Sequence, residues 1–254
     1  MMDNDLQYKI VKPDKSLADF VDSFWMLHNT SDNDRNIIGL PDGRIDLFLF
    51  KSPEEPFCIA LIGAETQRYE QGLIQAGSLR FCISFKLLAI EYIFREPISD
   101  IRNNAKILPV GFWDFNENDL KDFERFVAKA TQKIQSRLPH EIDERKRKLF
   151  EFIYASKGQI TVKDLSEKVF WSARQINRYF NQQFGISLKM YCNILRFRAS
   201  LNHIAEGKLF PEENFTDQNH FIKEIKKFSG VVPKELSKNK NDRFILLSSM
   251  KWKS

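Results

Sequence analysis

The sequence predicts an α+β N-terminal domain with antiparallel strands, followed by an all-α C-terminal domain that contains a repeated, capped helix. Two observations predict this division. Strand-like apolar runs are confined to the first part of the 254 residues, whereas an internal repeat with helical period occupies the last part. We place the boundary in a highly charged stretch near residue 140, which gives domains at 1–140 and 141–254.

The first domain carries three strand signals. Residues 44–50 form an apolar run that predicts a mostly buried strand, and residues 58–62 form a second, shorter run. Residues 79–85 alternate between apolar and other side chains, which predicts a strand with one buried face. The segment 41–43, Pro-Asp-Gly, predicts a turn before the first of these strands, with its glycine at positive φ.

Two helices are expected after these strands. Residues 87–94 predict a short helix. Apolar residues then recur at spacings of three and four from Leu120 to Leu138, which predicts an amphipathic helix. Asn118 is the candidate N-cap of that helix, because a side-chain oxygen at this position accepts hydrogen bonds from the first turn.

The charge is divided unevenly between the two parts of the chain. Residues 146–254 hold 21 Lys and Arg against 10 Asp and Glu, whereas residues 1–145 hold 18 against 24. A basic domain joined to an acidic one suggests that the basic part meets a polyanion. A basic surface that serves only to keep the protein soluble, without binding a polyanion, would show the same imbalance.

Other features exclude several classes of protein. Cys58, Cys82 and Cys192 are far apart and the four histidines show no ligand spacing, so we expect no disulfide framework, metal site or cofactor. No apolar run approaches the roughly 18 residues that span a membrane, and the N-terminus is polar and acidic. We therefore expect a cytoplasmic protein that does not contact membranes.

The last part of the chain repeats itself at an offset of 45 residues. Ser172 matches Asp217 as an N-cap, and Gly185 matches Gly230 as a helix end in left-handed conformation. Between them, an apolar stripe follows the spacing i, i+4, i+8 in both copies. The opposite face is polar and basic. Its residues are Arg174, Gln175, Asn177, Arg178 and Asn181 in the first copy, and Gln218, Asn219, Lys223, Lys226 and Lys227 in the second.

The residues before the first copy predict its helical partner. Thr161 is a candidate N-cap for a helix with Leu165 and Val169 on one face, and Phe170 and Trp171 form a short turn. A helix, a short turn and a second capped helix are typical of a helix-turn-helix. A face of Arg, Lys, Asn and Gln suits DNA bases and phosphates. A helical protein-interaction module with a solvated polar face is the alternative interpretation.

At this point the sequence resembles a known family. Residues 161–166, Ser172–Phe180, 184–187 and Leu195–Ala199 resemble the first half of an AraC/XylS-type DNA-binding domain. Phe215–Phe221 and Lys226–Pro233 resemble its second half, so that the match covers about residues 150–240. The resemblance implies two helix-turn-helix units, joined by a helix over about Leu188–Glu206, that enter successive major grooves of DNA.

The resemblance also implies roles for individual side chains. Base-facing positions fall on Arg174, Gln175, Asn177 and Arg178 in the first unit and on Gln218, Asn219 and Lys223 in the second, with phosphate contacts from Lys226 or Lys227. The sequence departs from the family between Ala205 and Phe215, where the supporting helix of the second unit is shortened and contains Pro211. Ile225 also replaces the usual phenylalanine. Both departures suggest that the second unit holds DNA less firmly and less rigidly than is usual in the family.

The first domain resembles the sensor-like domain that accompanies some of these regulators. The matching strings are Leu40–Phe50, Leu79–Phe85 and Glu96–Ile101. The implied function is a sequence-specific bacterial transcription regulator, either an activator or a repressor. Its expected partners are double-stranded DNA, a small-molecule effector, a second copy of the chain and RNA polymerase.

Two further hypotheses compete with this one. An architectural DNA-binding protein without sequence preference needs only the basic surface. An enzyme fused to a DNA-binding module would need a reactive group, but neither Cys58 nor Cys82 lies in a reactive motif. The sequence also lacks a phosphate-binding loop and a nucleophile elbow, so we expect no catalytic residue.

Overall fold

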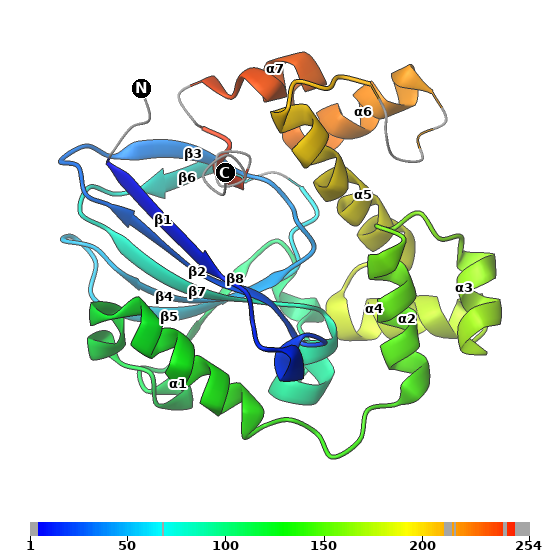
Figure 1. Cartoon of the computed structure of the whole chain (residues 1–254), viewed down its shortest axis with the longest axis horizontal. Helices are drawn as coiled ribbons and strands as arrows, with labels where there is room; N and C mark the ends of the chain where they lie inside the picture. The colour runs from blue at the N-terminus through cyan, green and yellow to red at the C-terminus, as the bar shows by residue number, and fades with distance from the viewer. Residues whose placement is uncertain (1–4, 68, 211–214, 216, 241–242, 247–254) are drawn as a thin grey trace. The chain divides into compact units, whose positions relative to one another are not determined.

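The computed structural model describes residues 5–67, 69–210, 215, 217–240 and 243–246 (Figure 1). Its contacts divide the chain into two compact units. The first unit, called here the sheet unit, comprises Met1–Arg35, Arg44–Ala64 and Leu73–Ile142. The second, the helical unit, comprises Asn36–Gly43, Glu65–Gly72 and Asp143–Ser254.

An antiparallel sheet of six strands forms the centre of the sheet unit. In spatial order its strands are β1 (Leu6–Val11), β2 (Val21–Asn29), β7 (Leu79–Phe85), β4 (Ile45–Lys51), β5 (Cys58–Ile62) and β8 (Ala105–Leu108). The strands expected over 44–50, 58–62 and 79–85 are β4, β5 and β7, so these three predictions are confirmed. A separate two-stranded sheet pairs β3 (Arg35–Gly39) with β6 (Tyr69–Ile74).

The prediction that β7 buries only one face is wrong. Cys82 and Ser84 are buried as well as Phe81, because β7 lies between β2 and β4 in the middle of the sheet. On one face, Phe81 packs with its ring centroid 5.3 Å from that of Phe126. On the other, the Ser84 hydroxyl accepts a hydrogen bond from the Trp25 indole at 3.0 Å. A central strand of this kind is covered on both sides.

The amphipathic helix of the sheet unit begins later than the sequence predicts. Helix α1 spans Phe123–Gln135, and its N-cap is Asp122, whose side chain accepts from the Arg125 amide at 3.0 Å. The predicted cap, Asn118, lies inside a 3-10 turn, Glu117–Lys121. Asn116 caps that turn, and the extended backbone at Asp122 then separates the turn from α1. Figure 1 shows α1 lying against one face of the sheet.

Short helical turns connect the other strands of the sheet unit. The helix expected over 87–94 is present as a π-helix, Ile90–Phe94, preceded by one helical turn. The remaining turns are 3-10 helices at Lys15–Leu17, Ser99–Ile101 and Phe112–Asp114. The glycine of the predicted turn, Gly43, has φ of 76°, as expected.

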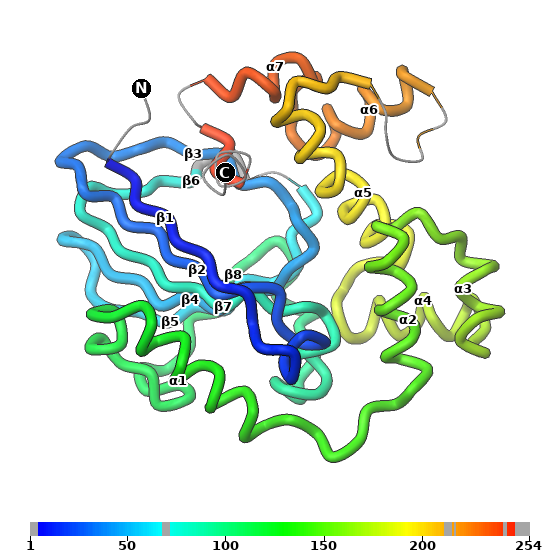
Figure 2. The backbone as a smooth tube through the Cα atoms, in the orientation of Figure 1, coloured from blue at the N-terminus to red at the C-terminus, as the bar shows by residue number. Residues whose placement is uncertain are grey.

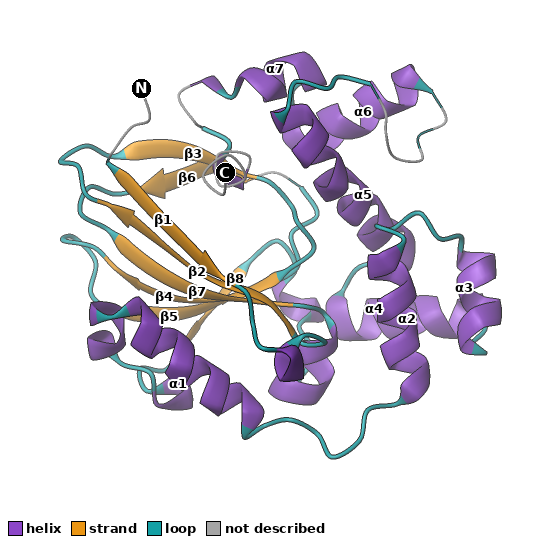
Figure 3. Ribbon diagram, in the orientation of Figure 1, coloured by secondary structure: helices purple, strands orange, loops and turns teal. Residues whose placement is uncertain are grey.

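The helical unit contains α2 (Glu144–Ala155), α3 (Val162–Val169), α4 (Ala173–Phe184), α5 (Leu188–Ala205), α6 (Gln218–Ser229) and α7 (Pro233–Lys238). Figure 3 shows that these elements are all helices, and no strand occurs among the described residues of 109–240. The backbone trace shows α5 running from the α2–α4 group to the α6–α7 group (Figure 2). The predicted fold class, a sheet domain followed by a helical one, is therefore confirmed.

One helix of the predicted second pair is not seen. After α5, the described residues 206–210, 215 and 217 have no helical structure, and Pro211 lies outside the described residues. Among described residues, the second helix-turn-helix unit therefore consists of the capped helix α6 followed by α7, and no supporting helix precedes α6. This agrees with the shortening that the sequence shows there.

Three contacts hold separate segments of the helical unit together. Gly158, just after α2, lies so near α5 that a Cβ atom at this position would stand 2.2 Å from the Cys192 carbonyl oxygen. Leu40 and Phe244, from opposite ends of the sequence, are buried in one apolar cluster with residues of α5, α6 and α7. The Ile38 amide also donates a hydrogen bond to the Arg243 carbonyl at 2.6 Å.

Candidate nucleic-acid interface

Helices α3 and α4 form the predicted helix-turn-helix. The Thr161 hydroxyl caps α3 by accepting from the Asp164 amide at 3.1 Å. Phe170 then adopts the left-handed conformation with φ of 53°, which ends α3 and starts the turn. The Ser166 hydroxyl donates to the Trp171 carbonyl at 2.6 Å and holds the turn closed. Three residues, Phe170 to Ser172, therefore connect the two helices, as is usual in this motif.

A capping box starts α4. The Ser172 hydroxyl accepts from the Gln175 amide at 3.3 Å, and the Gln175 side-chain oxygen accepts from the Ser172 amide at 2.9 Å. This reciprocal pair satisfies two backbone donors of the first turn. Gln175 is exposed, but its side-chain oxygen is committed to the cap.

The exposed face of α4 is a polar stripe. Arg174, Asn177, Arg178 and Asn181 follow the spacing i, i+3, i+4, i+7, which places them on one side of the helix. Asn177 and Asn181 donate their side-chain amides to the carbonyls of Ala173 and Asn177 at 3.0 and 2.9 Å. Within the described part of the chain, the side chains of the exposed Arg174 and Arg178 make no hydrogen bond or ion pair. They are therefore available to a ligand.

An aromatic core fixes α4 from the other side. Ile176, Phe180 and Phe184 are fully buried along the inner face. The Phe150 ring of α2 lies 5.8 Å from Phe180 and 6.0 Å from Phe184, measured between centroids. Burying side chains of this size contributes roughly 1.5–3 kcal/mol each. The polar stripe is thus presented on a rigidly packed helix.

Helix α6 repeats this arrangement. The Asp217 carboxylate caps it by accepting from the His220 amide at 2.8 Å, and Gly230 ends it with φ of 77°. Phe221 and Ile225 are buried on its inner face, so the isoleucine that replaces the usual phenylalanine still fills the core. The first helix has the same inner positions and the same glycine end, at Gly185 with φ of 68°.

The outer face of α6 carries the predicted basic residues. Asn219, Lys223 and Lys226 are exposed at the spacing i, i+4, i+7. The side chains of Lys223 and Lys226 have no ion-pair partner among the described residues. Lys227 is also exposed, but its ammonium lies 3.7 Å from the Glu224 carboxylate. The stripe of α6 therefore contains two lysines without an ion-pair partner among the described residues and one side-chain amide.

Gln218 occupies a different place from the other candidates. It is half-buried, and its side-chain amide donates to the Leu209 carbonyl at 2.9 Å. The side chain thus fastens the segment after α5 to the first turn of α6. The sequence could not show this, because the hydrogen bond depends on the path of a connecting segment without regular structure.

Cys58 and Cys192 both have raised pKa values. Burial raises the pKa of Cys58, which Glu55 also raises and Arg80 lowers. Burial likewise raises the pKa of Cys192, to about 11. A raised pKa disfavours the thiolate, which is the nucleophilic form. No group of His, Cys, Asp and Glu residues that could hold a metal ion occurs among the described residues. None of the described helices combines the length and apolar character needed to span a membrane.

One protein-family model and several solved structures resemble the chain. A family model described as a domain of unknown function, DUF6597, matches residues 9–106, which is less than half of the chain. No sequence among curated proteins matches the chain.

The solved structures that resemble the chain include several of ToxT from Vibrio cholerae, an AraC-family regulator. ToxT from strain O395 aligns with a TM-score of 0.45 and 10% identity, covering 92% of this chain and 97% of ToxT. ToxT bound to (E)-4-(8-methylnaphthalen-1-yl)but-3-enoic acid aligns with 0.42 and 12%, covering 96% and 100%. ToxT with a bound unsaturated fatty acid aligns with 0.39 and 11%, covering 92% and 95%. At TM-scores below 0.5, these likenesses do not by themselves assign the chain to a family.

Proposed function

We propose that the chain is a sequence-specific DNA-binding transcription regulator of the AraC/XylS type, which reads DNA with α4 and α6. The observation that carries this proposal is the pair of matching outer stripes. Arg174 and Arg178 on α4 stand at the same repeat positions as Asn219 and Lys223 on α6, and all four are exposed. Each stripe lies on a capped helix whose opposite side is buried.

In this proposal the stripe of α4 mainly contacts bases, and the stripe of α6 mainly contacts phosphates. Arg174 and Arg178 are one helical turn apart, about 6 Å along the axis, which corresponds to about two base pairs. Arginine forms paired hydrogen bonds with guanine, so α4 supplies most of the sequence preference. Lys223 and Lys226 on α6 are point charges that suit phosphates, with Asn219 as the base-reading side chain.

The sheet unit modulates DNA binding in this proposal, through a bound small molecule or through pairing with a second copy. A contact with RNA polymerase would follow from activation of transcription. The proposed function includes no chemical reaction of the protein itself.

Competition between a selected duplex and random duplex tests the proposal. A specific regulator prefers the selected site by about 10³ or more. Arg178→Ala should weaken binding to the selected site by about 1–3 kcal/mol and relax preference at one base pair. Arg125→Ala, on α1 of the sheet unit, is the matched control and should leave binding unchanged. Equal affinity for selected and random duplex would show an architectural DNA-binding protein instead.

The contribution of α6 is tested by salt. Lys226→Ala should reduce the slope of log affinity against log salt concentration by about one, since one phosphate contact releases about one counterion. The sequence preference should stay the same. Lys121→Ala in the sheet unit is the control. An unchanged slope for Lys226→Ala would remove this lysine from the interface.

A further inference from the structure

The sheet unit contains a cavity of about 520 Å³ that the proposed DNA-binding surface does not use. Its floor is formed by Leu61 of β5 and by Lys106 and Leu108 of β8. Leu61 and Lys106 are register partners, so they point to the same face of the sheet. The walls come from the end of the π-helix, the segment that follows it, the turn at Phe112–Asp114, and the two residues that follow α1, Ser136 and Arg137. A volume of this size lies within the range of small-molecule sites.

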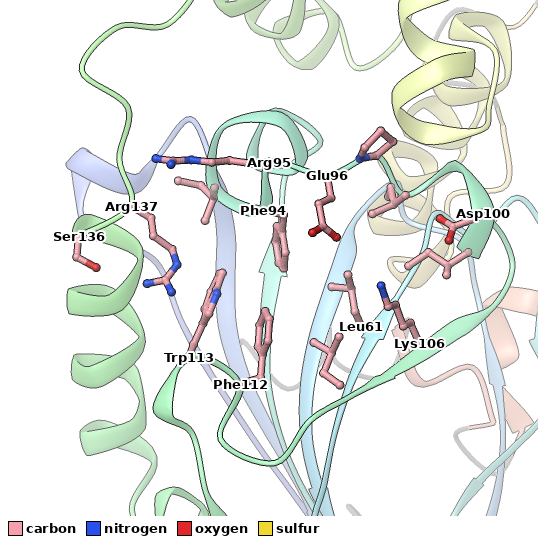
Figure 4. Close-up of a pocket in the computed structure, with 15 residues that line it drawn as sticks. Leu61, Phe94, Arg95, Glu96, Asp100, Lys106, Phe112, Trp113, Ser136 and Arg137 are labelled. Carbon is pink, nitrogen blue, oxygen red and sulfur yellow. The ribbon is translucent and has the colours of Figure 1, made fainter.

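One side of the cavity is aromatic. Trp113 stacks with Phe94 and with Phe112, with ring centroids 5.1 and 5.2 Å from its own. The guanidinium of Arg137 lies over the Trp113 ring at 4.9 Å. Figure 4 shows Phe112, Trp113 and Arg137 together at this side of the cavity. The rings offer a flat apolar surface to part of a ligand.

The other side carries charges of both signs. Glu96 extends into the cavity from above and Lys106 from its floor, and Asp100 lies beyond them (Figure 4). Arg95 completes the charged lining. Among the described residues, the side chains of these four make no ion pair or hydrogen bond. The cavity therefore offers both acidic and basic groups to a ligand.

Two of the residues that line the cavity have a strained backbone conformation. Arg95 and Trp113 have φ of 62° and 54°, although neither is glycine. Left-handed conformation is uncommon for side chains of this size and costs about 1–2 kcal/mol per residue. Arg95 also ends a π-helix, a form that occurs frequently at functional sites. Such strain persists where the surrounding structure holds it, and it clusters at ligand sites.

We propose that this cavity binds a small zwitterion with a large apolar body, such as an aromatic α-amino acid. Lys106 receives the carboxylate, Glu96 and Asp100 receive the ammonium, and the aromatic wall receives the apolar body. The inference rests on the small-molecule part of the proposed function and names the class of ligand. Binding to this cavity can be measured without DNA, so its failure would be distinguishable from a failure of DNA binding.

Calorimetric titration of the full chain without DNA tests this inference. The probes are L-phenylalanine and L-tryptophan, together with 3-phenylpropionate, which lacks the ammonium, and phenethylamine, which lacks the carboxylate. At least one of the two amino acids should bind at a single site, and each one-charge analogue should bind about tenfold more weakly or worse. Equal binding of 3-phenylpropionate, or no binding of either amino acid, would overturn the proposal.

Variants then locate the site. Lys106→Met and Glu96→Gln should each weaken binding of the amino acid by about tenfold, whereas Lys121→Met and Glu141→Gln, exposed in the same unit, should not. Lys106 and Glu96 are themselves exposed, so thermal unfolding should show that the variants fold like the parent. Unchanged affinity in Lys106→Met and Glu96→Gln would place the bound amino acid elsewhere and contradict the assignment.

Discussion

Replacement of Gly158 by alanine should destabilise the helical unit by more than its backbone conformation alone explains. Gly158 has φ of 75°, and an added Cβ would lie 2.2 Å from the Cys192 carbonyl oxygen and 2.9 Å from the carbonyl carbon. Ordinary contact begins near 3.4 Å, so the backbone of α5 would have to move by about 1 Å. Left-handed conformation costs an alanine about 1–2 kcal/mol, and forced repacking costs about 1–3 kcal/mol more.

Gly207 provides the matched control for this substitution. Its φ is 79°, but no atom lies within 4 Å of the Cβ that would be added. Gly207→Ala should therefore show the conformational cost alone, about 1–2 kcal/mol, and Gly158→Ala about 2–5 kcal/mol. Urea unfolding followed by the helical circular dichroism signal measures both. Equal losses in the two variants would refute the close contact between Gly158 and α5.

Three further predictions follow from the helical unit. Ser172→Ala removes the N-cap of α4 and should lower the free energy of unfolding by about 1 kcal/mol in urea titration; an unchanged midpoint would contradict the capping box. Phe244→Ala empties a fully buried position in the apolar cluster and should cost about 3–5 kcal/mol, whereas a loss under 1 kcal/mol would show that Phe244 does not fill that cluster. Burial raises the pKa of Cys192 from 9.0 to about 11, so the unfolded thiol loses its proton first as pH rises. Stability should therefore fall between about pH 9 and pH 11, and Cys192→Ala should reduce this fall when unfolding is followed against pH.

Local signals explain most of what the sequence predicts correctly. In α4 the N-cap Ser172, the buried stripe and the final Gly185 all lie within one short segment, so the helix can be identified from its own residues. The same holds for β4 and β5, whose apolar runs are continuous. These elements can be recognised from the sequence because the patterns that identify them are contained within them.

Strands without a regular pattern are missed. β2 contains an irregularity in register between Val21 and Ser23, which interrupts the two-residue period. β8 is four residues long and exposes three of them, so it does not look like a buried strand. Its hydrogen bonds to β5 define it, and these are contacts between distant residues.

The uses of individual polar side chains also depend on distant contacts. Gln175 and Gln218 belong to the same predicted polar faces as Arg174 and Asn219. In the structure, however, the Gln175 side chain completes a cap and the Gln218 side chain binds the Leu209 carbonyl. The cavity of the sheet unit is built from several segments that are far apart in sequence, so no sequence motif predicts it. The packing of Leu40 against residues of α5, α6 and α7 likewise joins segments that are far apart in sequence.

The central claim is that α4 and α6 each read one segment of the same duplex. Hydroxyl-radical footprinting of the full chain on a selected site tests it most directly, with Arg178→Ala and Lys223→Ala as the variants. Two protected segments about 10 base pairs apart are expected, since two recognition helices enter successive major grooves about 34 Å apart. Each variant should weaken protection chiefly in its own segment. A single protected segment, or the same uniform loss in both variants, would contradict this account.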